Sequence, residues 1–441
     1  MRLSVVLIIG FLVLAMPFTL RAISEKGFYA DNQVYYNMRA SDAISNGIYY
    51  DQLENRPFEL SLINYLGILT NYNIILPILL GLISLFILFK FSREYYNQFL
   101  FALIAPSLFA LSPIFIFLFS SMISEMLALF FFFIWVWLYH KKSLWSVALL
   151  SLIAISDIEF FFVSLILLGI YYLYDKNNRL FSYNLLSIIV AAIFYFFNPF
   201  YLDFVSPSFS NYFTSFGAQA GVSIFYLFLA LLGIFIFWKK TRSKKYFFTA
   251  FFVMFIFSLF LVEARIIFTV MLCLLAANFS VFLIKRVWAI PIIKRFTLLL
   301  ILCGIIFSSA LFINHTINMP PNKELIQGLD FLKTCTPGGV LSSDDLGFII
   351  QYYSDHPTTF DNINQTQPDI FYSRDLNFVK DYFKKNNIKF VLVTSKVNQN
   401  LWSKEDQGLL FLLNNAANFD LIYGSDNLRI WELVNPVTKT V

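Results

Sequence analysis

Charged residues are scarce in this chain. Asp, Glu, Lys and Arg make up only 13% of its 441 residues, whereas soluble domains carry about 25%. Hydrophobic residues make up 59% and aromatic residues 20%, and the mean hydropathy is +0.69. This composition is that of a membrane protein. The net charge of +5 indicates no nucleic-acid partner, because the basic residues stand in short clusters between apolar runs, as membrane topology requires.

Cysteine and histidine are also rare. Cys273, Cys303 and Cys335 are too few for a disulfide framework. Three histidines, none near another in sequence, argue against a histidine-based metal site. The chain has no G-x-x-x-x-G-K-[ST], no G-x-G-x-x-G after a strand, no H-E-x-x-H and no G-x-S-x-G. These absences argue against an ATP-driven pump and against the common hydrolases.

Long apolar runs fill the first two thirds of the sequence. A membrane-spanning helix needs roughly 20 apolar residues, because the bilayer core holds no water to satisfy an open backbone. This criterion predicts about eleven spanning segments. They cover residues 3–21, 73–91, 97–116, 120–139, 144–156, 160–174, 182–199, 222–238, 246–262, 266–284 and 296–313.

The basic residues predict how these segments are oriented. Loops on the inner face of a membrane carry an excess of Lys and Arg. With the N-terminus in the cytoplasm, the inner loops receive most of the basic residues that precede the last span, including Lys90, Arg93, Lys141, Lys142, Lys176, Arg179, Arg242, Lys244, Lys285 and Arg286. We therefore expect an odd number of crossings in the cell membrane, with a C-terminal segment outside the cytoplasm.

The chain changes character near Asn318. Residues 1–318 read as a polytopic membrane domain whose first outer loop is 22–72, and residues 319–441 read as soluble sequence. Helical patterns at 323–335, 375–387 and 406–419 alternate with strand patterns at 338–344, 388–394, 421–424 and 428–434, whereas 346–354 fits either. Such alternation predicts a small extracytoplasmic α/β domain.

The first outer loop is the most polar and aromatic stretch near the membrane. It carries Asp31, Tyr35, Tyr36 and Arg39 within GFYADNQVYYNMRASDAISNG. Asp31 is a candidate catalytic carboxylate, because a polar loop at a membrane surface is where chemistry can take place. It is also a candidate N-cap, since the residues after it resemble an amphipathic helix. Both readings can hold.

Other carboxylates fall at the predicted outer ends of spanning helices, where each is a functional hypothesis because a charge near the membrane is costly. Asp157 and Glu159, in S-D-I-E, can both reach a hard divalent cation such as Mg²⁺ or Mn²⁺, although any tight outer turn needs polar residues. Glu125 begins a long apolar helix, where the helix dipole also favours an acid.

Glu263 and Arg265 flank a predicted outer junction in FLVEARIIF. An arginine there can hold a phosphate through two parallel hydrogen bonds. The alternative is a local interfacial ion pair, or an arginine that reaches the lipid head groups.

Taken in order, these features resemble the GT-C superfamily of polyprenyl-phosphate-dependent membrane glycosyltransferases, which includes oligosaccharyltransferase catalytic subunits and protein mannosyltransferases. The resemblance rests on an early acid, aromatics and an Arg in the first outer loop, on Leu111-Ser112-Pro113 before the helix with Glu125, on the turn S-D-I-E, and on E-A-R at 263–265. The chain departs from the oligosaccharyltransferases in lacking a Trp-Trp pair.

The resemblance implies a membrane glycosyltransferase that moves a sugar or glycan from a polyprenyl (dolichyl-type) phosphate carrier to a protein, glycan or lipid acceptor outside the cytoplasm. It assigns catalysis to Asp31 and Glu125, donor binding to Tyr35, Arg39, Glu263 and Arg265, and a possible Mn²⁺ or Mg²⁺ to Asp31, Asp157 and Glu159. The alternatives are a flippase for lipid-linked glycans and a non-catalytic scaffold of a glycan assembly complex.

Overall fold

The structure, a computed structural model of the chain, describes residues 3–59, 61–174, 179–197, 223–240, 245–342, 346–359, 369–395, 402, 407–415 and 417–434. Lys176, Arg242 and Lys244, which help to predict the topology, lie outside these residues. The chain forms two compact units. The helical unit comprises Met1–Arg21 and Glu59–Asn318, and the mixed unit comprises Ala22–Phe58 and Met319–Val441.

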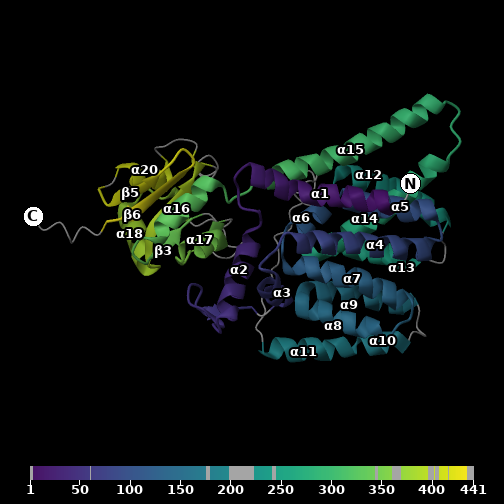
Figure 1. Cartoon of the computed structure of the whole chain (residues 1–441), viewed down its shortest axis with the longest axis horizontal. Coiled ribbons are helices and arrows are strands. Elements are labelled where there is room, and N and C mark those ends of the chain that lie inside the picture. The colour runs from purple at the N-terminus through teal and green to yellow at the C-terminus, as the bar shows by residue number, and fades with distance from the viewer. Residues whose placement is uncertain are drawn as a thin grey trace, which may run out of the picture. The chain divides into compact units, whose positions relative to one another are not determined.

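The helical unit is a bundle of apolar helices (Figure 1). Its elements are α1 (Leu3–Ile23), α3 (Leu62–Thr70), α4 (Ile75–Tyr96), α5 (Phe99–Ala110), α6 (Pro113–Ser120), α7 (Ser124–His140), α8 (Trp145–Ser156), α9 (Ile158–Tyr174), α10 (Arg179–Asn184), α11 (Leu186–Phe197), α12 (Ile224–Lys240), α13 (Lys245–Phe257), α14 (Val262–Lys285) and α15 (Pro291–Ile317).

Only some of these helices are both long enough and apolar enough to be membrane spans. Among the described residues, five are long and apolar enough, and the bent pair α5–α6 makes a sixth if it is one span. The five are Leu3–Ile23, Ile75–Tyr96, Arg179–Phe196, Val262–Lys285 and Pro291–Ile317. Other apolar helices, such as α7 and α9, are shorter. The chain is a mostly helical membrane protein, and the count of about eleven spans stays a prediction.

The predicted span 97–116 is divided between two helices. α5 and α6 are bent by 64° at a short break. Ser112 N-caps α6, since its hydroxyl accepts a hydrogen bond from Phe115 N at 3.3 Å, and Pro113 occupies the first helical position. Proline is favoured there because that position has no helical N–H partner to lose. The Ser-Pro pair therefore starts a new helix instead of continuing the old one.

α14 is the central helix of the bundle. Of its most apolar stretch, 72% is buried, against 44% or less in the other four long apolar helices. Its partner α12 approaches so closely at Gly233 that a Cβ added there would overlap with Leu275 O. Small residues allow such close backbone contact between membrane helices. α14 therefore provides a firmly packed support for the residues at its ends.

The mixed unit combines helices with a four-stranded sheet. Its elements are α2 (Asn32–Ser45), β1 (Tyr50–Asp51), β2 (Arg56–Pro57), α16 (Lys323–Lys333), β3 (Gly339–Leu341), α17 (Gly347–Ser354), η4 (Asp369–Tyr372), α18 (Leu376–Lys385), β4 (Ile388–Thr394), α20 (Gly408–Asn415), β5 (Phe419–Gly424) and β6 (Leu428–Leu433). The segment 346–354, which fitted either helix or strand, forms α17.

The sheet has the order β3-β4-β6-β5. β3 pairs with β4 in parallel, whereas β6 runs antiparallel to both β4 and β5. Phe383 of α18, Val391 of β4 and Trp431 of β6 belong to one buried apolar cluster. The amphipathic helices thus cover an apolar sheet, as in an ordinary α/β core. Its position outside the cytoplasm stays a prediction.

Residues 22–58 of the predicted first outer loop pack within this mixed unit. Tyr36, 2% exposed, packs against Phe58 and Phe348, and Asn32 Oδ1 accepts a hydrogen bond from Ile349 N at 3.0 Å. Near the loop start, Gly27 N donates to Pro321 O at 3.1 Å. Residues 22–58 thus share a compact unit with residues 319–441, a grouping that the division at 318/319 did not anticipate.

Candidate metal and active site

Three carboxylates from three parts of the helical unit meet at one point. Glu125, Asp157 and Glu263 each offer a carboxylate oxygen, and these oxygens lie within 4.8 Å of one another. More than 100 residues of sequence separate Asp157 from Glu263. We call these three residues the acidic cluster.

Local sequence places the first two members. Glu125 is in the first turn of α7, where the partial positive charge of the helix end favours an anion. Ser124 Oγ donates to Glu125 Oε2 at 3.1 Å. Asp157 has extended backbone between α8 and α9, and its Oδ1 accepts a hydrogen bond from Phe160 N at 2.7 Å. Each acid is therefore held at a helix start.

Glu263 is the most buried member. It lies in the first turn of α14 and is 5% exposed. The sequence predicts Glu263 at the junction between two spans, and α14, which begins at Val262, includes it. Its Oε2 has no hydrogen-bond partner among the described residues. A buried carboxylate oxygen without a partner is costly unless a proton or cation compensates it.

Further acidic residues surround the cluster. Glu159 lies close enough to Glu263 for the two carboxylates to repel each other. Burial raises the pKa of Asp157 to about 6, and the charges of Glu159 and Glu59 act in the same direction. The Tyr195 hydroxyl of α11 donates a hydrogen bond to Ala154 O at 2.8 Å. Tyr195 lies near enough to Asp157 and Glu59 for their charges to act on it. The site therefore concentrates negative charge.

This donor set suits a hard divalent cation. Carboxylate oxygens are the ligands that Mg²⁺, Mn²⁺ and Ca²⁺ prefer. Three anionic groups this close repel one another, and a cation between them would remove that repulsion. The unpartnered Glu263 oxygen supplies a free ligand position. The acidic cluster can therefore hold a hard divalent cation.

This cluster differs from the metal set expected from sequence. Asp157 is common to both, but Glu125 and Glu263 join it, and Glu159 is not a member. Asp31 belongs to the mixed unit, whereas the cluster lies in the helical unit. The sequence pattern grouped Asp157 with Glu159 because they are close in the chain. The fold groups Asp157 with two acids that are remote in the chain.

Asp31 is an N-cap. It precedes α2 with extended backbone, and its Oδ1 accepts a hydrogen bond from Gln33 N at 2.8 Å. Burial raises the pKa of the Asp31 carboxyl, and the Gln33 hydrogen bond opposes part of that increase. The capping role is thus observed, and the catalytic role stays a prediction.

Substitution of Asp31 by Asn and by Ala distinguishes its capping role from its predicted catalytic role. We expect Asp31→Asn to change the stability of α2 by less than about 0.5 kcal/mol, because Asn and Asp cap equally well, whereas Asp31→Ala costs about 1 kcal/mol. If Asp31 is the general base, Asn lowers sugar transfer by about 10²-fold or more. Hydrogen exchange of α2 and initial transfer rates provide the two measurements. Wild-type transfer by Asp31→Asn would restrict Asp31 to capping.

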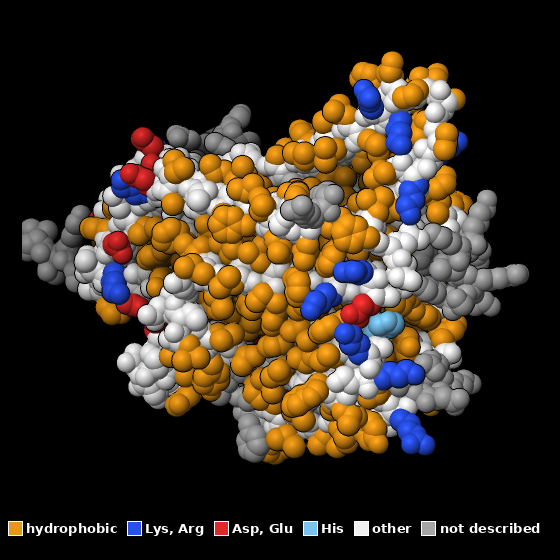
Figure 2. All heavy atoms as spheres, turned by 45° about the vertical axis from the view of Figure 1, so that its right-hand side comes forward, with side chains coloured by type: hydrophobic (Ala, Val, Ile, Leu, Met, Phe, Trp, Pro, Cys, Tyr) orange, Lys and Arg blue, Asp and Glu red, His pale blue; other side chains and the backbone are white. Residues whose placement is uncertain are grey.

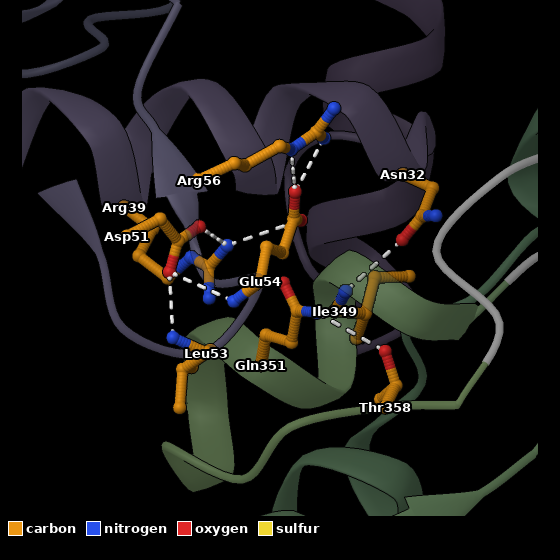
Figure 3. Close-up of polar contacts among 9 residues, drawn as sticks. All are labelled: Asn32, Arg39, Asp51, Leu53, Glu54, Arg56, Ile349, Gln351 and Thr358. Carbon is orange, nitrogen blue, oxygen red and sulfur yellow. Dashed lines mark hydrogen bonds and ion pairs between the residues drawn. The ribbon is translucent and has the colours of Figure 1, made fainter.

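Tyr35 and Arg39, expected to bind the donor, have internal partners. Tyr35 is 2% exposed and its hydroxyl donates to Tyr29 O at 3.0 Å. Arg39 pairs with Asp51 and, at 3.3 Å, with Glu54, which also pairs with Arg56 (Figure 3). These contacts join α2 to the β1–β2 hairpin. They assign both residues a structural role, and donor binding by them stays a prediction.

Arg265 leaves α14 on a different side from Glu263. Residues two apart on a helix differ by about 200° in direction. Arg265 is partly exposed, and its Nε donates to Ser258 O at 3.4 Å. A phosphate contact by Arg265 therefore stays a prediction. The E-A-R pattern places its acid in the cluster and its arginine on another face of the helix.

Sequence reasoning missed Glu59 and Tyr195. The charge of Glu59, in the segment before α3, acts on Asp157, and Tyr195 of α11 lies near enough for the charges of both acids to act on it. Glu59 is an acid close to the start of a helix on the predicted outer side, the same signal that identified Glu125. Tyr195 has no such signal, since it is one of 24 tyrosines in the chain.

No family model and no curated protein sequence matches this chain. Solved structures do match in fold. An oligosaccharyltransferase from Archaeoglobus fulgidus, tethered with an acceptor peptide, aligns with a TM-score of 0.61 at 12% identity over 89% of this chain and 69% of its own. The same enzyme in complex with Zn and sulfate aligns with a TM-score of 0.51 at 13% identity, over 88% of this chain and 68% of its own.

ArnT from Cupriavidus metallidurans, bound to undecaprenyl phosphate, aligns over 98% of both chains with a TM-score of 0.51 and 12% identity. Both neighbours are GT-C glycosyltransferases. Identities this low establish the fold and leave the reaction open. The resemblance predicted from the sequence is confirmed at the level of the fold: this chain is built like the GT-C membrane glycosyltransferases.

Proposed function

We propose that this protein transfers a sugar or glycan from a polyprenyl-phosphate carrier to an acceptor outside the cytoplasm, with a divalent cation at the acidic cluster. One observation carries the proposal: three carboxylates from separate helices meet within 4.8 Å in a GT-C fold, and one buried oxygen lacks a partner. In the neighbouring structures, Zn is bound by the Archaeoglobus enzyme and undecaprenyl phosphate by ArnT.

In the proposed reaction, the bond between the sugar C1 and the carrier phosphate oxygen breaks as the acceptor forms a bond to C1. A carboxylate accepts the proton of the acceptor. Glu125, Asp157 and Glu263 would hold the cation. When bound, the cation supplies positive charge beside the leaving phosphate. Arg265 is the proposed second phosphate contact.

Metal binding tests the site directly. We expect the purified protein to bind a single Mn²⁺ and Asp157→Asn to bind it at least about tenfold more weakly, because one of three anionic ligands is lost. Asparagine retains the cap on α9, since Asn and Asp are equivalent caps. Electron paramagnetic resonance of free Mn²⁺ measures the binding without any assay of activity.

Glu94→Gln is the matched control, because Glu94 is an exposed acid of α4 outside the cluster. We expect it to bind Mn²⁺ like the wild type. Equal affinities for Asp157→Asn and the wild type, or no binding of Mn²⁺, Mg²⁺ or Zn²⁺ by the wild type, would contradict the metal site. Binding of lipid-linked sugar without transfer would instead support the flippase or scaffold alternative.

A further inference from the structure

The helical unit contains a cavity of about 190 Å³. Residues of α4, α7, α9, α13 and α14 line it. None of the acidic cluster is among them, although Ile267, one helical turn after Glu263, is. On α14 the lining extends from Ile267 to Leu274, a rise of roughly 10 Å. This cavity is therefore elongated and separate from the proposed transfer site.

The walls of this cavity are apolar over most of its length. Phe132, Leu168, Ile267 and Val270 are lining residues with 6% exposure or less. Buried apolar cavities of about 150 Å³ stay free of water and bind small apolar molecules. Apart from Trp135, whose N–H donates to Asn184 Oδ1 at 3.2 Å, the polar hydrogens of the described lining residues belong to tyrosine and histidine side chains. The inner part thus suits a hydrocarbon.

Polar groups line only one end of the cavity. Tyr95 and Tyr96 are in the last turn of α4, His140 ends α7, and Tyr246 is in the first turn of α13. The hydroxyls of Tyr95 and Tyr246 contact each other, and His140 is exposed. These positions mark the mouth of the cavity, where aromatic residues with polar tips suit a membrane interface.

The surface around this mouth is basic. Among the described residues of this surface, Arg93, Lys141 and Lys142 are exposed, and the acid Glu94 pairs with Lys141 at 3.2 Å. Lys90 Nζ lies 5.5 Å from the Trp137 ring centroid beside them. Figure 2 shows Lys and Arg side chains gathered beside a broad hydrophobic surface. Clusters of this kind attract anionic lipid head groups.

We propose that the cavity binds one apolar chain of an anionic lipid, with the lipid head group at the basic mouth. A chain fits because the inner walls offer apolar contacts along the helix direction. An anionic head fits because the mouth carries more positive than negative charge. This site is independent of the acidic cluster and of the proposed transfer reaction.

Native mass spectrometry of the delipidated full chain tests the proposal. The probes are octanoyl lysophosphatidylglycerol, which is anionic, and octanoyl lysophosphatidylcholine, which is zwitterionic, because a lining of roughly 10 Å along α14 matches a chain of about eight carbons. We expect the wild type to retain a single anionic lipid and to bind the zwitterionic lipid several-fold more weakly. Ala250→Phe places a ring in the cavity and is expected to weaken binding of the anionic lipid by at least about tenfold.

Gly169→Phe is the control, because an added Cβ at Gly169 of α9 meets nothing within 4 Å and Gly169 does not line the cavity. It is expected to bind like the wild type. Arg93→Glu with Lys142→Glu should remove the preference for the anionic probe. Undiminished binding by Ala250→Phe would overturn the chain site, and equal binding of both probes by the wild type would overturn the head-group site.

Fluorescence provides a test that does not depend on filling the cavity. Trp135 lines it and is 4% exposed. A lysophosphatidylglycerol with a brominated chain should quench Trp135, so Trp135→Phe should lose part of the quenching that the wild type shows. The same fractional quenching in both proteins would place the chain elsewhere and contradict the proposal, even if Ala250→Phe failed to fold.

Discussion

Glu263→Gln is expected to lower the rate of sugar transfer from a polyprenyl-phosphate donor by about 10²- to 10³-fold, the usual cost of removing one buried electrostatic stabiliser. Glutamine preserves the volume of the side chain but removes the charge that would hold the cation. Without metal, the variant should be at least as stable as the wild type, because one of three mutually repelling carboxylates is gone. Initial rates and thermal unfolding measure the two effects.

The effect of Mn²⁺ on the unfolding temperature tests whether the acidic cluster holds a cation. If the acidic cluster holds a cation, Mn²⁺ should raise the unfolding temperature of the wild type and have little effect on Glu263→Gln, since a ligand stabilises only the state that binds it. Glu94→Gln, the same change at an exposed site, should retain the wild-type rate. A Glu263→Gln variant with the wild-type rate would remove the cluster from catalysis.

Arg39→Met is expected to destabilise the mixed unit by about 3 kcal/mol, near the lower end of the cost of breaking a buried ion pair. The Asp51 and Glu54 side chains are both 3% exposed, so each carboxylate would lose a cation without gaining water. Arg56 still compensates Glu54, which limits the loss. Thermal unfolding, with hydrogen exchange of residues 32–58, measures this loss of stability.

The same variant decides between the structural role of Arg39 and its predicted role in donor binding. If Arg39 has a structural role, Arg39→Met lowers the unfolding temperature of the protein. A donor-binding arginine would leave the unfolding temperature unchanged and raise the KM for the donor. Arg374→Met is the control, since Arg374 is exposed and lies over the Phe411 ring. It should change stability by less than about 0.5 kcal/mol. An equally small effect for Arg39→Met would contradict the structural role.

Sequence reasoning selected the right types of residue for the candidate site but grouped them by proximity in the chain. Glu125, Asp157 and Glu263 were each identified because an acid at the end of an apolar helix is costly. Their meeting within 4.8 Å depends on how α7, α9 and α14 pack. Periodicity along one helix contains no information on which other helix lies beside it.

Arg39 illustrates a second limit of the sequence. An arginine in a polar loop suggested a phosphate ligand, because guanidinium groups bind phosphate well. The carboxylates that bind it, Asp51 and Glu54, stand 12 and 15 residues further along. Only the β1–β2 hairpin brings them to α2. An ion pair of this separation has no local sequence signature.

The sequence by itself determined that the chain is a helical membrane protein, because long apolar runs have no other stable arrangement in a bilayer. It also determined that a helix begins after Asp31, since Asp31 satisfies a backbone N–H group that a helix leaves open. Tertiary structure alone decided which acids converge, which arginine is neutralised, and where a cavity is left between helices. Those outcomes depend on packing between distant segments, and packing is a property of the folded chain as a whole.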